Sequence, residues 1–368
     1  MDHSKELSIL SCPRVYAKSR FGLPLGFRGI FYNRCNSRLP ELSSNASPFH
    51  SALALVAEDM ASVDAVIGRR LDSGVPLVGQ VAQYIISAGG KRLRPILLLL
   101  MSKALGYSGN HHHTLAAVVE FIHTATLLHD DVVDDSTLRR GRATANEMFG
   151  NPASVLVGDF LYSRAFQMMV DVGDMRIMQI LSDATNVIAE GEVLQLMNMH
   201  DASLSEASYL KVIRSKTAKL FEASTRLSAV ISGQSALVEQ ACADYGQALG
   251  TAFQVIDDAL DYDGSAEEMG KNLGDDLREG KATLPLIVAM QRATPPDADA
   301  IRSAIENGDT DHLQSIIAIV KSTGALDATR DAAAAEARRA IEAIATLPDS
   351  VYKTALVQLA SSLLERRA

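Results

Sequence analysis

The sequence predicts an all-α protein built around one large helical domain. From His50 almost to the C-terminus, apolar residues recur at the three-to-four-residue spacing of amphipathic helices. No segment alternates convincingly as a strand. The chain has 368 residues, which also permits two domains, and its 47% hydrophobic content is enough for a full core. The predicted helices lie near residues 50–72, 76–87, 95–105, 112–133, 151–172, 174–198, 204–231, 235–262, 282–293, 298–306, 310–323, 325–345 and 348–366.

Residues 1–48 differ from the rest of the chain. They lack a helical period and hold seven Lys/Arg against three Asp/Glu. An Arg-rich and Ser-rich composition is typical of an organelle targeting peptide, although Asp2 and Glu6 are unusual at the start of one. We expect a disordered or targeting-like extension at 1–48 and a helical domain at 49–368. The protein would then be cytoplasmic, or organellar if the extension is a transit peptide.

Charge and cysteine content exclude several classes of protein. A net charge of −9 argues against a nucleic-acid binder. Cys12, Cys35 and Cys242 fit no disulfide framework and no zinc pattern, so we expect a reducing compartment. The longest apolar run, Pro95 to Met101, is far shorter than the roughly 18 residues that span a bilayer. We therefore expect a soluble protein, which could still contact a membrane at its surface.

Three carboxylates stand at the end of the helix predicted near 112–133. Asp130 and Asp134 are four residues apart and share one helix face, with Asp131 beside them. Like charges at this spacing destabilise a helix by a few tenths of a kcal/mol per pair. A hard divalent cation, which prefers oxygen ligands, is the best-matched counter-charge.

A second D-D-x-x-D motif, Asp257 to Asp261, ends another apolar helix. One acidic cluster at a helix end is usually a solvated terminus. Two copies, each preceded by an apolar helix, predict two helices that face each other and hold divalent metal between them.

Basic residues recur where an anion bound to such metal would need them. Three positive charges lie in the Gly-flexible loop Gly89 to Pro95, before a helix whose N-terminal amides favour anions. Taken singly, each basic residue reads as a solvated surface charge, but Lys91 and Arg94 interrupt an apolar stretch. Metal together with convergent Lys and Arg predicts a diphosphate site. The other basic segments are Arg139-Arg140-Gly141-Arg142, Lys216-Thr217 and Lys271.

Three other motifs are rejected. The segment from Gly264 to Lys271 departs from P-loop spacing and has Asn where Ser or Thr binds metal. His111 to His113 follow a Gly/Asn turn, so we expect an exposed loop and not a metal site. Glu120-x-x-His123 matches the di-iron bundle motif, but that fold needs a second copy, which the chain lacks.

Taken together, these motifs resemble the trans-polyprenyl diphosphate synthases, an all-α family of isoprenyl chain-elongating enzymes. The resemblance extends from about residue 52 to the C-terminus. One departure is Asp135, where many relatives have Glu. The motifs that carry the resemblance are G-G-K-R-L-R-P at 89–95, D-D-V-V-D with R-R-G at 130–141, Lys216-Thr217, Phe253-Gln254 with D-D-A-L-D at 257–261, and G-K-N-L-G-D-D-L at 270–277.

The resemblance implies a helical bundle around a deep central cavity, usually as a homodimer, and a role for each motif. Three Mg²⁺ are expected: two on Asp130 and Asp134, and a third on Asp257 with Asp261. The catalytic set is then Asp130, Asp131, Asp134, Asp257, Asp258 and Lys216. The allylic diphosphate would be held by Arg139, Lys216, Thr217, Gln254 and Lys271. Isopentenyl diphosphate would be held by Lys91, Arg94, His123 and Arg140.

The resemblance also implies a product length. In this family the growing tail runs beside the helix that carries the first acidic motif, and Ala125 and Thr126 lie about one turn before Asp130. Bulky aromatics at these positions are typical of short-chain relatives, so the small residues here predict a long product. We expect roughly octaprenyl diphosphate, made from farnesyl diphosphate for the side chain of a quinone such as ubiquinone.

Three alternatives remain. A shorter-chain geranylgeranyl synthase would carry the same motifs. A terpene cyclase shares the metal chemistry, but an aromatic pocket suits it better than a chain with no Trp and 5% aromatics. A catalytically silent partner subunit of such a synthase would be expected to lose acidic-motif residues, and both motifs are intact.

Overall fold

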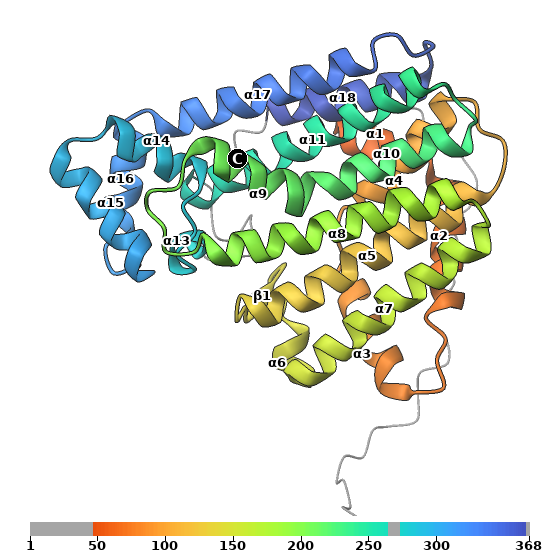
Figure 1. The fold of residues 1–368 in the computed structure, drawn as a ribbon, viewed down its shortest axis with the longest axis horizontal. Coiled ribbons are helices and arrows are strands. Elements are labelled where there is room, and N and C mark those ends of the chain that lie inside the picture. Colours follow the sequence, from red (N-terminus) through yellow and green to blue (C-terminus); the bar gives the residue numbers. More distant parts are fainter. Residues whose placement is uncertain (1–46, 264–272, 366–368) are drawn as a thin grey trace, which may run out of the picture. The chain divides into compact units, whose positions relative to one another are not determined.

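The computed structural model describes residues 47–263 and 273–365 and confirms the all-α prediction (Figure 1). Its first half contains α1 (Pro48–Leu55), α2 (Ala57–Arg70), α3 (Pro76–Ser87), α4 (Leu93–Ala104), α5 (His111–Val133), α6 (Ala145–Phe149), α7 (Asn151–Val172) and α8 (Met175–Met197). Then come α9 (Glu206–Ile213), the π-helical turn η1 (Arg214–Ala218), α10 (Lys219–Ile231), α11 (Ala236–Asp263), α13 (Asp275–Arg278), α14 (Leu284–Arg292), α15 (Pro295–Asn307), α16 (Leu313–Ser322), α17 (Ala325–Ala343) and α18 (Val351–Glu365).

The described residues belong to one compact unit, Ser44–Ala368. The extension expected at 1–48 lies almost wholly outside the described residues, so it stays a prediction. Within the described ranges, no helix combines the length and apolarity needed to cross a membrane.

The structure departs from the predicted elements in a few places. Two-residue strands, β1 (Leu138–Arg139) and β2 (Arg142–Ala143), pair antiparallel where no strand was predicted. Arg140 and Gly141, both with positive φ, form the tight turn between them. Strands this short cannot show an alternating pattern, which is why the sequence does not reveal them.

The histidine run was also misassigned. His111 begins α5, and His112 is 3% exposed, so the exposed loop expected there is wrong.

Two apolar cores lie along the helices, and two long helices contribute to both. The larger core takes Cys242 to Ala252 of α11 and the C-terminal half of α17, together with α1 to α8, α10 and α18. The smaller core takes Val255 to Tyr262 of α11 and the N-terminal half of α17, with α9 and α13 to α16. Figure 1 shows α17 running along α11 toward the group formed by α13 to α16. The second acidic motif therefore lies where α11 passes through the smaller core.

Helix α5 is a core helix whose last turn carries the first acidic motif. Its buried residues include Leu115, Val118 and Ile122, at the spacing of one helix face. The helix ends where Asp135 adopts a left-handed conformation, with φ of 48°. The Ser136 amide then donates to the Asp131 carbonyl at 3.0 Å, as in a Schellman cap. This cap ends the helix directly after the three carboxylates.

Glycines let two helices, α8 and α11, approach η1 closely. A Cβ on Gly191 of α8 would lie 2.9 Å from the Lys216 backbone nitrogen. A Cβ on Gly250 of α11 would lie 2.7 Å from the Ala218 Cα. The turn that carries Lys216 and Thr217 therefore packs between α8 and α11. A side chain at position 191 or 250 would prevent the corresponding contact.

We predict that Gly250→Ala destabilises the protein by about 2 kcal/mol and lowers activity, because the added methyl pushes η1 away from α11. Gly68→Ala is the matched control, since Gly68 lies in α2 with nothing within 4 Å of an added Cβ. It should be stabilising by roughly 0.5 kcal/mol, because alanine favours a helix interior over glycine. Urea unfolding of both variants measures the difference, and equal stabilities would contradict the close approach.

Candidate active site

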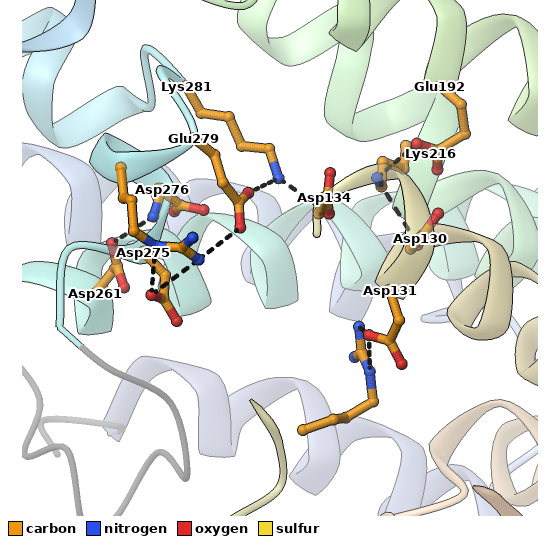
Figure 2. A network of polar contacts seen from close by, with 12 residues as sticks. Asp130, Asp131, Asp134, Glu192, Lys216, Asp261, Asp275, Asp276, Glu279 and Lys281 are labelled. Atoms are coloured by element: carbon orange, nitrogen blue, oxygen red, sulfur yellow. Dashed lines mark hydrogen bonds and ion pairs between the residues drawn. The ribbon is translucent and has the colours of Figure 1, made fainter. Parts of the chain in front are cut away.

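The first acidic motif at the end of α5 is only partly neutralised by the chain. Asp131 is fully buried, and its Oδ1 accepts hydrogen bonds from Arg139 Nε at 2.7 Å and Nη2 at 2.6 Å. Asp130 and Asp134 point away from this pair, toward Lys216 and Lys281 respectively (Figure 2). Asp131 is thus committed to positioning Arg139, and the other two carboxylates are presented for binding.

Lys216 lies between two carboxylates. Its Nζ is 2.6 Å from Glu192 Oε2 on α8 and 3.8 Å from Asp130 Oδ2. Burial raises the pKa of the Asp130 carboxyl, against the lowering effect of Lys216. Burial, with repulsion from Asp130, raises the pKa of Glu192 to about 7. One lysine therefore does not compensate the buried negative charge, which favours a bound cation.

The second acidic motif places its three carboxylates in different surroundings. Asp258 is 3% exposed and accepts hydrogen bonds from the Tyr209 hydroxyl at 2.5 Å and from Gln254 Nε2 at 2.8 Å. Burial, with repulsion from Asp276, raises its pKa to about 7. Asp261 is also buried, and its Oδ2 accepts the Asp276 amide at 3.2 Å. Asp257 is the more exposed member.

Asp258 also orders a chain of polar contacts that ends at η1. Gln254 donates to Asp258, and the Thr217 hydroxyl donates to Gln254 Oε1 at 2.9 Å. The structure thus brings together Thr217 and Gln254, two of the residues predicted to hold the allylic diphosphate. Asp258 contacts Gln254 and not Thr217, so its role in this chain of contacts is to orient the Gln254 side chain.

Lys281 connects the segment beside the second motif to the first motif. Its Nζ lies 3.4 Å from Asp134 Oδ2 and forms an ion pair with Glu279 (Figure 2). Burial would lower the pKa of Lys281, but the carboxylates of Asp134 and Glu279 outweigh it and raise that pKa. Sequence reasoning missed Lys281, although a lysine at the start of the apolar run 282–289 was a usable signal. It also missed Glu192, a carboxylate in a helix read only for its apolar spacing.

A separate basic group lies around α4 and α5. Arg94 Nη1 is 3.3 Å from His123 Nε2, and the guanidinium stacks over the Phe221 ring at 4.4 Å. The Arg140 guanidinium lies against the backbone of Gly90, where a Cβ would clash with it. Burial, with the charges of Arg94 and Arg140, holds the pKa of His123 well below its ordinary value, so this ring is neutral. Burial lowers the pKa of Arg94 to about 10, which leaves it charged at neutral pH.

The two remaining predicted binding residues are Lys91 and Lys271. Lys91 is exposed in the loop before α4. Lys271 lies outside the described residues.

The two predicted chain-length residues differ in exposure. Ala125 is fully buried within α5. Thr126 is partly exposed, and its hydroxyl donates to the His123 carbonyl at 2.8 Å. Of these two residues, only Thr126 has a solvent-accessible side chain, and it lies one helical turn before the first acidic motif.

The fold and the site define a class of protein: an all-α enzyme with two acidic helix ends and two groups of cations, the arrangement that a diphosphate-binding transferase needs. Comparison with known proteins agrees with this. The Polyprenyl synthetase family matches residues 75–321. The chain belongs to this family of Mg²⁺-dependent prenyltransferases.

Individual relatives match most of the chain. Octaprenyl diphosphate synthase of Escherichia coli (strain K12) is 53% identical over 313 residues, covering 85% of this chain and 97% of that protein. All-trans-nonaprenyl-diphosphate synthase (geranyl-diphosphate specific) of Rhodobacter capsulatus is 47% identical, with 85% and 97% covered. A crystal structure of polyprenyl synthase from Caulobacter crescentus CB15, complexed with calcium and isoprenyl diphosphate, has a TM-score of 0.85 and 46% identity. It covers 89% of this chain and 100% of that one.

Kinetics should distinguish the basic group around Arg94 from Lys216, because the two are predicted to hold different diphosphates. We predict that Arg94→Ala raises the KM for isopentenyl diphosphate by about tenfold, with a smaller effect on the allylic substrate. Lys216→Ala should do the reverse, because each variant loses a charge-assisted contact to one diphosphate. Arg302→Ala, which removes a charge from an exposed ion pair with Asp299, is the control and should change neither KM. Equal effects of Arg94→Ala and Lys216→Ala on both substrates would show that the division is wrong.

Proposed function

We propose that this protein is a long-chain all-trans-polyprenyl diphosphate synthase that adds isopentenyl diphosphate repeatedly to an allylic diphosphate. The single observation that carries the proposal is the presence of two acidic motifs, the first of which is contacted by Lys216 and Lys281, together with a separate basic group at Arg94 and His123. Identity of 53% to an octaprenyl diphosphate synthase favours a product near that length. Farnesyl diphosphate is the proposed primer, and a quinone side chain the proposed destination.

The carboxylates fit Mg²⁺ because they offer hard oxygen donors, and the buried negative charge around Asp130 and Glu192 is undercompensated. We place two ions on Asp130 and Asp134 and a third on Asp257 with Asp261. When bound, Mg²⁺ would neutralise charge that develops on the departing diphosphate.

The chain's own residues then bind and orient two diphosphates. In the proposed arrangement the allylic diphosphate is held by Arg139, Lys216, Thr217, Gln254 and Lys271. Isopentenyl diphosphate is held by Lys91, Arg94, His123 and Arg140. Breaking the allylic C–O bond leaves a carbocation, and the double bond of isopentenyl diphosphate supplies the electron pair for the new C–C bond. Loss of one proton, which we assign to the released diphosphate as acceptor, completes the cycle. Cationic side chains stabilise the leaving group, so no side-chain nucleophile is needed.

We further propose a homodimer formed through the hairpin of α7 and α8. Large apolar side chains are exposed along both helices, and such a patch is typical of a protein interface. They are Val155, Leu156, Val170, Met175, Val193, Leu196 and Met197. Sedimentation equilibrium tests this, and a monomer at micromolar concentration would exclude it.

Location and membrane contact are also proposals. By likeness to the bacterial relatives we propose a cytoplasmic protein that contacts a membrane peripherally to release its hydrocarbon product. Cell fractionation and vesicle flotation with bound product would test the two parts.

The proposed activity is tested by incubating the protein with farnesyl diphosphate, isopentenyl diphosphate and Mg²⁺ and sizing the products by chromatography.

Asp130→Ala and Asp257→Ala should each lower turnover by at least about 10²-fold, because each removes an oxygen ligand of the Mg²⁺ that would stabilise negative charge in the transition state. Asp135→Asn is the matched control, since Asp135 is exposed and asparagine also tolerates its left-handed backbone. Wild-type protein without turnover would favour the silent-subunit alternative.

Product length should respond to bulk before the first motif. We predict that Thr126→Phe shortens the product, because its side chain obstructs the path of the tail. Ala125→Val, Ala125→Leu and Ala125→Phe should shorten it stepwise, because bulk added at this buried position displaces the neighbouring Thr126 into that path. The rate of the first condensation, measured alone, is the control for folding and should change little. Unchanged chain length across the series would place the floor of the channel elsewhere.

A further inference from the structure

A cluster of two histidines and an aspartate lies at the N-terminal end of α5. His112 Nε2 is 3.2 Å and His113 Nε2 is 2.9 Å from the same oxygen, Asp59 Oδ1 on α2. These donor atoms all lie within 4.8 Å of one another. Asp130 follows His112 by 18 positions on the same helix. At about 1.5 Å per residue the two ends are roughly 27 Å apart, so this cluster is separate from the active site.

The spacing of the donors suits a tetrahedral metal ion. With metal–ligand bonds of about 2.0 Å, neighbouring donors in such a site lie about 3.3 Å apart. This is close to the 3.2 Å and 2.9 Å that separate the two histidine nitrogens from Asp59 Oδ1. Two imidazole nitrogens and one carboxylate oxygen are ligands typical of Zn²⁺, whereas Mg²⁺ prefers oxygen ligands alone. The donor set therefore selects a different ion from the one proposed for the acidic motifs.

The surroundings hold the ligands in place. His112 is buried with its ring edge-on to Tyr107 at 5.3 Å, and the two imidazole rings lie 3.9 Å apart. Lys103 Nζ is 3.1 Å from Asp59 Oδ2, which orients the carboxylate and leaves Oδ1 toward the histidines. The positive charge of Lys103 opposes a bound cation, so we expect micromolar rather than nanomolar affinity.

A surface cavity gives access to the cluster. Its lining includes His113 together with His111, Asn110 and, from α2, Ser62 and Val66. An ion can therefore reach His113 from solvent, and a water molecule that enters through this cavity would supply the fourth ligand.

From this geometry we propose that Asp59, His112 and His113 bind one Zn²⁺ per chain and so tie α2 to the start of α5. The ion links two helices that are distant in sequence, so its role is structural. The site does not depend on the proposed catalytic function.

The test measures Zn²⁺ binding to full-length protein in excess Mg²⁺ by competition with a chromophoric chelator. All proteins carry Cys12→Ser and Cys35→Ser, which remove thiols that also bind Zn²⁺. Wild-type protein in this background should bind one equivalent and gain thermal stability with Zn²⁺. His113→Gln should weaken binding at least about tenfold and abolish the thermal gain. His312→Gln, at an exposed site outside the cluster, is the control and should bind as wild type.

Asp59→Asn is the second ligand variant, and circular dichroism confirms that each variant is folded. Co²⁺ used as a spectroscopic probe should give visible absorption bands that are lost in His113→Gln and Asp59→Asn. Equal Zn²⁺ affinity in wild type and His113→Gln, or no Zn²⁺ binding by wild type, overturns the proposal. Asp59 would then act only as a shared hydrogen-bond acceptor for the two histidines.

Discussion

The accumulation of carboxylates at the ends of two apolar helices is the constraint on which the rest of the site depends. Helix C-termini already carry partial negative charge, so acidic side chains there are disfavoured unless cations compensate them. The chain supplies Arg139 to Asp131, Lys216 to Asp130 and Lys281 to Asp134. Lys216 and Lys281 are each shared with a second carboxylate, Glu192 and Glu279 respectively, so negative charges outnumber positive ones. This imbalance of charge is the property on which the proposed binding of metal and diphosphate rests.

Backbone packing converts this charge pattern into a defined geometry. The π turn η1 interrupts what would otherwise be one helix from α9 to α10, and π turns are frequent at functional sites. Gly191 and Gly250 allow α8 and α11 to contact it on two sides. Lys216 and Thr217 are then fixed with respect to both acidic motifs, even though these residues come from three separate helices. Packing of small residues is thus as much a part of the site as its charged groups.

The basic group around Arg94 and the surroundings of Lys281 differ in the protonation and charge of their side chains. Around Arg94 and Arg140, mutual repulsion and burial keep His123 neutral, so this imidazole donates or accepts hydrogen bonds without adding charge. Around Lys281, nearby carboxylates hold the ammonium charged. The group around Arg94 and Arg140 is therefore rich in positive charge, whereas Lys281 lies among carboxylates.

The sequence by itself determined the helices and the two acidic motifs, because periodicity and the spacing of Asp130 and Asp134 are local properties of the chain. It also indicated Arg94 as a candidate binding residue, because Arg94 interrupts an apolar run, and the structure places this side chain beside His123. Only the tertiary structure decided that Lys281 reaches Asp134, that Glu192 shares Lys216, and that Asp258 is held by Tyr209. It also decided that His112 and His113 meet Asp59, where the local pattern indicated an exposed loop. Each of these contacts joins residues far apart in sequence, and their meeting depends on how whole helices pack, which no local pattern of residues encodes.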